Sequence, residues 1–335
     1  MFNLVPELAS ADSLVFWSNG CFTNMLDCGA EHFKLRQLDM PRNFFSGNNC
    51  VVEYGHFPSN FLVGVSTAAN DIQFRRQMRS RLGDPTTVAG NPAVRFASTS
   101  FEVANKIKPL PNFRLFVARI FFFDFCAIGI LPVTEGLIFT VLYICLLRAE
   151  LHSLATAAIA LVFTEINLVL ICIAIKKSLV GNEWGADDWA PFWSWRHFAY
   201  FFAQDCFFVW CRVPLLFCAG TILSNSVLRW MGCRIGNRTI VVQPMQCSDW
   251  NAVAVGNDCV VDGVLQLHTF EKMELKVKRT RIQDGCAVCF GATVMGGVII
   301  ERDTTLFPLS LVLKEMHLLT ASYEGSPVEP LSFTS

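Results

Sequence analysis

The sequence has 335 residues, of which 16% are charged and 53% are hydrophobic, and its formal net charge is −1. Soluble domains average roughly 25% charged residues, so this composition favours a membrane protein with about two domains. The near-neutral charge, with no basic block and no zinc-finger spacing, excludes the usual nucleic-acid-binding classes. The cysteines show no framework spacing, and we interpret most of them as reduced thiols.

The first expected element is a solenoid, because large apolar residues recur every six positions at Phe45, Val51, Phe57 and Val63. A period of six is neither helical nor simply alternating. It is the signature of a β-solenoid, in which each turn stacks on the next. We therefore expect residues 1–110 to form an incomplete N-terminal β-helix domain.

Two apolar segments follow, at 126–147 and 154–175, and a short polar turn joins them. Each is long enough to cross a hydrocarbon core, which takes about 20 helical residues. More basic residues lie on the two flanks of this pair than in the turn between its segments. The positive-inside rule then predicts that region 111–180 is a transmembrane hairpin in a multi-pass protein, with both soluble flanks in the cytoplasm.

Each predicted span contains one acidic residue, Glu135 in the first and Glu165 in the second. A carboxylate inside a membrane is costly and indicates a function by default. The alternatives are a protonated side chain hydrogen-bonded across the hairpin and a side chain that faces a water-filled cavity. The sequence leaves these three open.

Residues 181–230 are apolar but interrupted by Arg212, Pro214 and Gly220, and they include a tryptophan-rich stretch. Indole rings favour the headgroup level of a bilayer. We expect this region to form helices that lie on the membrane surface or re-enter it.

The six-residue period is strongest near the C-terminus and predicts a complete β-helix domain over residues 231–330. Aliphatic residues point into such a solenoid, and small residues follow four positions later near a corner. Shorter runs begin at Ile235 and Val255. The aliphatic series is Ile282, Val288, Val294, Ile300, Leu306 and Val312, and the later positions are Cys286, Ala292, Val298, Thr304 and Ser310.

This repeat resembles the left-handed β-helix of hexapeptide acyltransferases. The resemblance implies that both β-helix domains are left-handed, parallel and of that trimeric type. With the predicted transmembrane α-helical hairpin between them, we expect a mixed membrane protein. The segment "VAGNPA" resembles the loop of those enzymes beside the pantetheine arm of coenzyme A, and "EGSPVEP" repeats its Gly-Xaa-Pro. Asn91 and Ser326 would then contact pantetheine through their loops. Val94 stands where those enzymes often carry a basic residue.

A longer series of segments is similar to one family, the C-terminal region of poly-lysine synthetase-type (Pls/PosA) nonribosomal peptide synthetases. These segments include "IKKSLVGNEWGADDWAPFWSWRHFAYFFAQ", "AGTILSNSVLRWMGCRIGNRTI" and "LQLHTFEKMELKVKRTRIQDGCAVCFGATVMGG". The resemblance covers roughly 40–330. It implies aminoacyl or acyl transfer from the phosphopantetheine arm of a carrier protein to an amine. No adenylation or carrier segment is recognisable, so a fragment, a split subunit and a degenerate copy are all expected alternatives.

Thioester aminolysis needs a base to deprotonate the incoming amine, and histidine is the usual choice. We predict His268 as the general base, with Glu271 orienting it or holding the incoming cation. Asp258 and Asp262 are candidate substrate-binding residues that could line the site with negative charge. A surface or capping histidine is the alternative for His268. The sequence predicts no metal site.

Three functions remain open at this point. The first is the terminal acyl-transfer module of a membrane-bound peptide synthetase, whose partners are a carrier (thiolation) protein or upstream synthetase domains and the lipid membrane. The second is a stand-alone membrane acetyltransferase that uses acetyl-coenzyme A. The third is a truncated, non-catalytic membrane scaffold. A homo-oligomer is an open alternative in each case.

Overall fold

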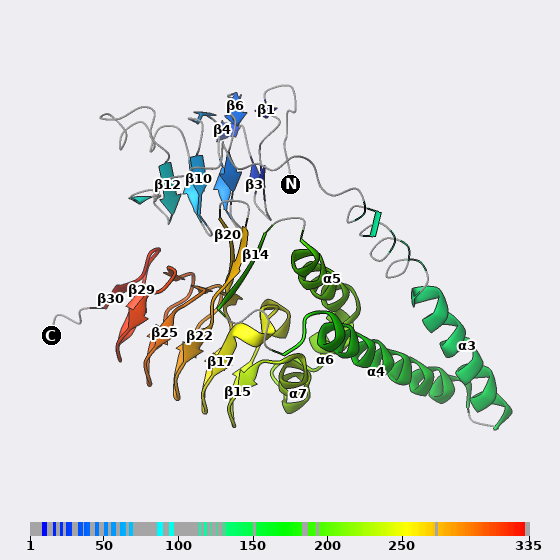
Figure 1. Cartoon of the computed structure of the whole chain (residues 1–335). Helices are drawn as coiled ribbons and strands as arrows, with labels where there is room; N and C mark the ends of the chain where they lie inside the picture. Colours follow the sequence, from blue (N-terminus) through cyan, green and yellow to red (C-terminus); the bar gives the residue numbers. More distant parts are fainter. Residues whose placement is uncertain are drawn as a thin grey trace. The chain divides into compact units, whose positions relative to one another are not determined.

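The computed structural model of the chain describes part of its residues (Figure 1). These are residues 9–11, 16–17, 21–22, 25–28, 33–35, 37–40, 44–46, 50–52, 55–57, 61–64, 67–69, 86–89, 94–96, 114, 117–118, 121, 125, 129, 131–149, 152–182, 187–191, 194–271 and 274–331. The chain divides into two compact units. One comprises residues 1–107, 309–312 and 323–335, and the other comprises 108–308 and 313–322.

The first unit contains a parallel β-helix, because successive strands alternate among three sheets. The sheets are β1 (Ala9–Ala11), β6 (Leu38–Met40) and β9 (Gly55–His56); β2 (Phe16–Trp17), β7 (Phe45–Ser46), β10 (Phe61–Val63), β12 (Thr86–Ala89) and antiparallel β13 (Val94–Phe96); and β3 (Cys21–Phe22), β8 (Val51–Val52) and β11 (Ala68–Ala69). A hairpin of β4 (Met25–Cys28) and β5 (Phe33–Leu35) projects between the first two turns. The unit also has β27 (Leu311–Val312), and β29 (Ser322–Glu324) pairs with β30 (Glu329–Pro330).

The core of this β-helix agrees with the predicted period at Phe57 and Val63, which are buried, but not at Val51. Val51 is 37% exposed, and its neighbour Val52 is fully buried. The prediction was wrong by one residue in this turn, because adjacent residues of a strand point to opposite faces. The structure also adds an earlier turn, β1 to β3, where the sequence showed no period.

The second unit contains a longer parallel β-helix (Figure 1). One sheet is β15 (Arg234–Ile235), β17 (Val253–Val255), β22 (Thr280–Ile282), β25 (Ile299–Ile300) and β28 (His317–Leu318). The second includes β16 (Ile240–Val241), β18 (Val260–Val261), β23 (Ala287–Val288) and β26 (Thr305–Leu306), and the third includes β19 (Val264–Gln266) and β24 (Thr293–Met295).

The six-residue period predicted the interior of this β-helix correctly. Every aliphatic and small position of the predicted C-terminal series from Ile282 to Leu306 is buried, and so are Ile235 and Val255. Ser310 and Val312, which belong to the first unit, are buried as well. At one corner, small side chains stack from turn to turn and donate to a carbonyl of the next turn. These bonds run from Thr239 to Gly256 at 2.6 Å, Cys259 to Gln283 at 3.0 Å, Cys286 to Glu301 at 2.9 Å and Thr304 to Leu319 at 3.3 Å.

Two insertions interrupt the turns of this β-helix. The first runs from residue 242 to 252 and contains the 3₁₀ turns η3 (Pro244–Gln246) and η4 (Trp250–Ala252). The second is a hairpin of β20 (His268–Glu271) and β21 (Glu274–Val277), which extends a small antiparallel sheet with β14 (Asp188–Pro191). Both insertions leave from the third side of the β-helix, on neighbouring turns.

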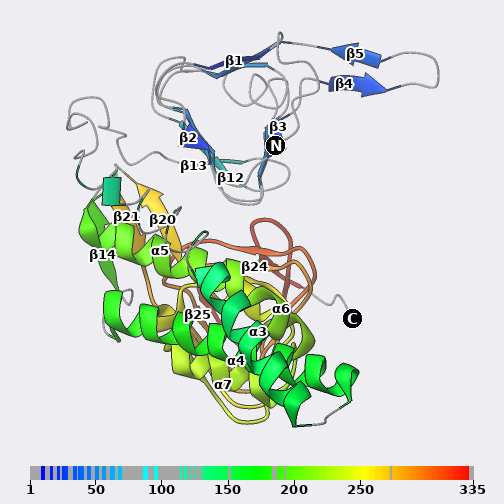
Figure 2. The ribbon, with the colours of Figure 1, turned by 90° about the vertical axis from the view of Figure 1, so that its right-hand side faces the viewer.

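Three helices cover the first insertion and the adjoining turns: α5 (Trp195–Trp210), α6 (Arg212–Phe217) and α7 (Ile222–Met231). The longer helices α3 (Leu131–Arg148) and α4 (Ser153–Leu179) form an antiparallel hairpin that packs on them through α4 (Figure 2). Because α4 ends at this layer, its last turn lies beside the β-helix.

The hairpin predicted from the sequence is present as a pair of packed helices. Glu135 of α3 is buried and accepts a hydrogen bond from the Asn167 side chain of α4 at 2.8 Å. Of the alternatives for Glu135, the structure therefore has the carboxyl bonded across the hairpin. Glu165 is half-buried.

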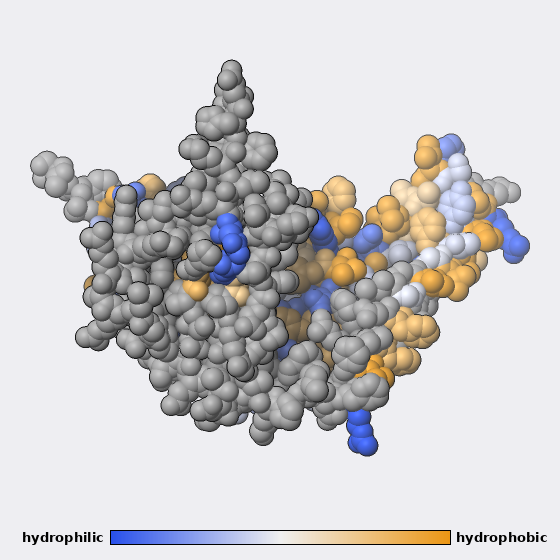
Figure 3. All heavy atoms as spheres, turned by 90° about the horizontal axis from the view of Figure 1, so that it is seen from above, coloured by the Kyte–Doolittle hydropathy of each residue, from blue (hydrophilic) through white to orange (hydrophobic). Residues whose placement is uncertain are grey.

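Only α4, among the helices in the described part of the chain, is long and apolar enough to cross a membrane by length and composition. The first predicted span, 126–147, corresponds to α3, which has 18 residues. At about 1.5 Å per residue it reaches roughly 27 Å, slightly less than a typical hydrocarbon core. Apolar side chains nevertheless gather over both helices (Figure 3).

Candidate active site

Asp249 is the centre of the site, and it lies in the first insertion of the C-terminal β-helix. The residue is 1% exposed. Its carboxylate accepts hydrogen bonds from the backbone N–H groups of Leu267 and His268 at 2.7 and 3.1 Å. It also accepts from the Tyr200 hydroxyl and from the Gln204 amide, the latter at 3.2 Å. A buried charge is tolerated when it is bonded in this way.

His268 completes the cluster, with its ring nitrogen Nδ1 at 2.8 Å from one oxygen of Asp249 and 3.0 Å from the other. Because Asp249 is ionised and can only accept, Nδ1 carries the proton. The other ring nitrogen, Nε2, has no hydrogen-bond partner among the described residues. The His268 side chain is 12% exposed. The lone pair on Nε2 is therefore available.

The two residues meet because they belong to neighbouring turns of the β-helix. The insertion that carries Asp249 packs on β19, and His268 follows β19 directly. Stacking of the turns thus brings together side chains that are 19 positions apart in the sequence. Their geometry depends on the β-helix rather than on a flexible loop, which suits a site that needs fixed positions.

Helix α5 supplies the remaining wall. Its N-terminus is capped by Ser194, whose hydroxyl accepts from the His197 N–H at 3.2 Å. Tyr200 and Gln204 are one helical turn apart and therefore face Asp249 together. Phe201 lies edge-on to the His268 ring, with 6.2 Å between the ring centroids.

The surroundings shift the pKa values of both members of the pair. Burial lowers the pKa of His268, but the charge and hydrogen bond of Asp249 outweigh it, so the net pKa is raised. Burial acts to raise the pKa of Asp249, and the charge and hydrogen bonds of its neighbours lower it overall. Burial, followed by the charge of Asp249, raises the pKa of the Tyr200 hydroxyl well above its usual range. An ionised Asp249 beside a titratable His268 can orient a general base.

A second contact anchors the Asp249 insertion to the end of α4. The Lys176 ammonium is fully buried and donates to the Asn251 side chain at 2.7 Å. The amide of Asn251 in turn donates to the Gly181 carbonyl at 3.2 Å. Gly232, at φ 118°, leaves the room for this contact, because a Cβ there would lie 2.3 Å from the Asn251 oxygen.

Two predicted substrate-binding residues, Asp258 and Asp262, have their hydrogen-bond partners outside this cluster. Asp258 is exposed and pairs with Arg238, with 2.7 Å between its Oδ2 and Nη2. Asp262 accepts from the Gln243 amide at 2.8 Å. Their predicted role in substrate binding stays a prediction.

The predicted pantetheine-binding and orienting residues are less well placed by the structure. Asn91 lies outside the described residues, and so does the side chain of Glu271. Ser326 is half-buried and belongs to the first unit. The carboxylate that contacts Nδ1 of His268 is that of Asp249. The assignments of Asn91, Ser326 and Glu271 stay predictions.

Sequence reasoning identified His268 but missed Asp249, Tyr200 and Gln204. One signal could have indicated Asp249: the segment "QPMQCSDWNA" interrupts the period between the runs at Ile235 and Val255. An insertion at a corner of a β-solenoid is where a functional loop is expected. No such signal marks Tyr200 or Gln204, which lie on a largely apolar helix.

Comparisons with known proteins identify no family. No protein-family model and no curated protein matches the chain. Among solved structures, it is similar to a serine acetyltransferase (CysE) of Neisseria gonorrhoeae in complex with serine, at 12% sequence identity and a TM-score of 0.17. The match covers 54% of this chain and 76% of the acetyltransferase. A likeness at this level carries no argument about function.

Proposed function

We propose that this protein transfers an acyl or aminoacyl group from a pantetheine thioester to an amine, with His268 as the general base. One observation carries the proposal. Nδ1 of His268 is held by the buried carboxylate of Asp249, while Nε2 has no partner among the described residues and the side chain is partly exposed. A histidine held in one tautomer by a carboxylate is the arrangement that general-base catalysis needs.

The reaction follows from that geometry. Nε2 of His268 takes a proton from the incoming amine as the nitrogen attacks the thioester carbonyl. A C–N bond forms, the C–S bond breaks, and the pantetheine thiolate leaves and takes up the proton from the imidazolium. Asp249 stabilises the positive charge on His268 between these two steps. A positioned base of this kind contributes roughly 10²–10⁴-fold to the rate.

The finer form of the proposal follows the family resemblance. The donor is then the phosphopantetheine arm of a carrier protein, and the chain acts as the terminal module of a membrane-bound peptide synthetase. Free coenzyme A as the donor is the alternative. The pantetheine arm is a substrate in either case, and its contacts with Asn91 and Ser326 are part of this proposal.

The experiment compares two histidine variants in thioester aminolysis, with acyl-pantetheine, acyl-coenzyme A and carrier-bound thioester as donors. His268→Gln should lose about 10²–10⁴-fold in turnover. His317→Gln is the matched control, because His317 also pairs with a carboxylate but is 52% exposed. Equal activity of both variants would contradict the proposal and favour a non-catalytic scaffold.

We also propose that the protein is a multi-pass membrane protein, with α3 and α4 in the bilayer, α6 and α7 at its surface, and both soluble units in the cytoplasm. The exposed apolar side chains support this. Around the turn between α6 and α7, four large apolar residues are more than 60% exposed: Leu216 at 71%, Phe217 at 82%, Ile222 at 75% and Leu223 at 61%. Such a surface marks a membrane or partner contact.

Photo-crosslinking in sealed vesicles tests this location. A photoreactive phenylalanine analogue at position 217 should crosslink to lipid. The same analogue at Phe290, which is 63% exposed on the β-helix, should not. Crosslinking of both positions to lipid, or of neither, would overturn the proposed location without affecting the test of His268.

A further inference from the structure

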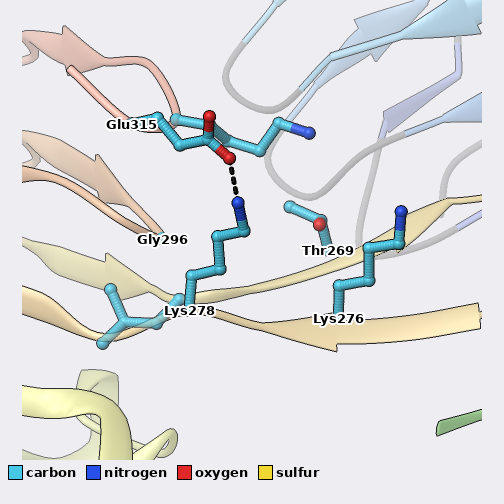
Figure 4. Close-up of a pocket in the computed structure, with 7 residues that line it drawn as sticks. Thr269, Lys276, Lys278, Gly296 and Glu315 are labelled. Carbon is cyan, nitrogen blue, oxygen red and sulfur yellow. Dashed lines mark hydrogen bonds and ion pairs between the residues drawn. The ribbon is translucent and has the colours of Figure 1, made fainter. Parts of the chain in front are cut away.

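A second polar site lies on the opposite face of the β20–β21 hairpin from His268 (Figure 4). The hairpin pairs Thr269 with Lys276 across its two strands. Side chains alternate between the faces of a strand, so Thr269 and Lys276 point away from the face that carries His268. They line a pocket together with Leu267, Lys278, Gly296, Lys314 and Glu315.

The pocket is small and cationic. Its volume of about 120 Å³ is roughly four times the share of one liquid water molecule. Three lysines and one glutamate line it, so its formal charge is 3 − 1 = +2. The Lys278 ammonium donates to the Glu315 carboxylate. The hydrogen bond and charge of Lys278 lower the pKa of Glu315, and the charges of Lys314 and Lys276 add to this effect. The positive charges of all three lysines therefore lie close to the Glu315 carboxylate in this pocket.

The wall of the pocket depends on two adjacent glycines. A Cβ at Gly296 would lie 2.4 Å from the Leu267 carbonyl oxygen. A Cβ at Gly297, whose φ is +81°, would lie 3.0 Å from the Glu315 side chain and 3.4 Å from that of Lys278. The side-chain stems of Lys278 and Glu315 thus pass over backbone that carries no side chain.

We infer that this pocket binds a phosphate group. Its volume suits a group with about five heavy atoms, and its net positive charge favours an anion. Lysine ammonium groups are common phosphate ligands. Burial lowers the pKa of Lys314, which is consistent with a cation that gains from an anion beside it. This inference does not depend on the chemistry at His268, which lies on the other face of the hairpin.

Titration of the full-length protein with inorganic phosphate at low ionic strength tests the inference. Lys314→Gln and Lys276→Gln should each weaken phosphate binding roughly five-fold, the effect of one partly exposed charge pair. Glu315→Gln should act in the opposite direction and tighten it, because the carboxylate repels the anion. Arg302→Gln is the matched control, since Arg302 is exposed on the same β-helix and does not line the pocket.

The inference is overturned if Glu315→Gln fails to tighten binding in a variant that melts like the wild type. It is also overturned if Arg302→Gln weakens binding as much as Lys314→Gln, because phosphate would then respond to the general surface charge. A parallel titration with phosphopantetheine identifies the source of the group. Tighter binding of the ester than of inorganic phosphate indicates a substrate phosphate, and equal binding indicates the free anion.

Discussion

The C-terminal β-helix contains two histidine–carboxylate pairs with the same separation and different surroundings. Nδ1 of His268 lies 2.8 Å from Oδ1 of Asp249, and Nε2 of His317 lies 2.8 Å from Oε1 of Glu301. The first pair has side chains that are 12% and 0% exposed, whereas those of the second are 52% and 31% exposed. Water solvates the second pair and screens it. A short distance alone therefore does not mark a site; the buried, fully bonded carboxylate does.

The largest difference between the two pairs should appear in stability. Asp249→Ala leaves His268, Tyr200 and two backbone N–H groups without their acceptor. Removing one member of a buried charged pair costs about 3–5 kcal/mol of unfolding free energy. Glu301→Ala should cost less than about 0.5 kcal/mol. Chemical denaturation of both variants measures this, and equal losses would end the distinction between the pairs.

The second difference concerns turnover. Asp249→Asn keeps the shape of the side chain but removes the charge that fixes the tautomer of His268. We expect the rate of thioester aminolysis to fall by about 10²-fold or more. The matched Glu301→Gln variant should keep the wild-type rate. An Asp249→Asn variant with the wild-type rate would show that His268 acts without its carboxylate, or not at all.

Tyr200→Phe should have a smaller effect, because Asp249 keeps its other donors. Loss of one hydrogen bond to a charged group costs about 1.5–3 kcal/mol, and partial compensation by the remaining donors should bring the loss toward the lower end. The melting temperature of Tyr200→Phe should therefore fall less than that of Asp249→Ala. The reverse order would mean that α5, rather than the β-helix, holds the carboxylate.

The pH dependence sharpens the comparison further. Since the pKa of His268 is raised, its contribution to stability is complete below about pH 6.5 and is lost as the pH rises through the raised value. The lowered pKa of Asp249 makes its contribution complete above about pH 3.9 and lost as the pH falls through the lowered value. The stability difference between wild type and Asp249→Asn should thus be greatest between about pH 4 and 6.5.

Activity should follow the neutral form of His268 instead. The acid limb of the wild-type pH–rate profile should lie above about pH 6.5, the usual histidine value. It should move to lower pH in Asp249→Asn, because the neighbouring negative charge is gone. Turnover measured from pH 5 to 9 checks the direction, and an unchanged limb would assign it to another group.

Much of the fold could be predicted because its signal is local. A six-residue period needs no knowledge of distant contacts, and it identified buried positions such as Ile300 and Leu306. It failed where phenylalanine filled the interior irregularly. In the N-terminal β-helix the rings of Phe44, Phe57 and Phe61 pack together, with 5.1 Å between the centroids of the last two. Only one of these three residues follows the predicted period.

The candidate site could be predicted only in part, because its contacts join different turns. His268 could be selected from the sequence because it lies where an insertion interrupts the six-residue period. Asp249 could not, since its partnership with His268 arises only when two turns stack. The predicted partner Glu271 was chosen for its nearness in sequence, and its role stays a prediction because its side chain lies outside the described residues.

The β-helix that positions His268 and Asp249 is a linear stack, and both residues come from its first two turns. Within the stack each turn contacts the turns beside it, and the Lys278–Glu315 ion pair also joins the hairpin after β19 to the residues just before β28. The stack can therefore gain turns at its far end, beyond β28, while the pair keeps its geometry. A change of even one residue between β16 and β19 would instead shift one member past the other. Tolerance to length variation should thus differ sharply along the same repeat.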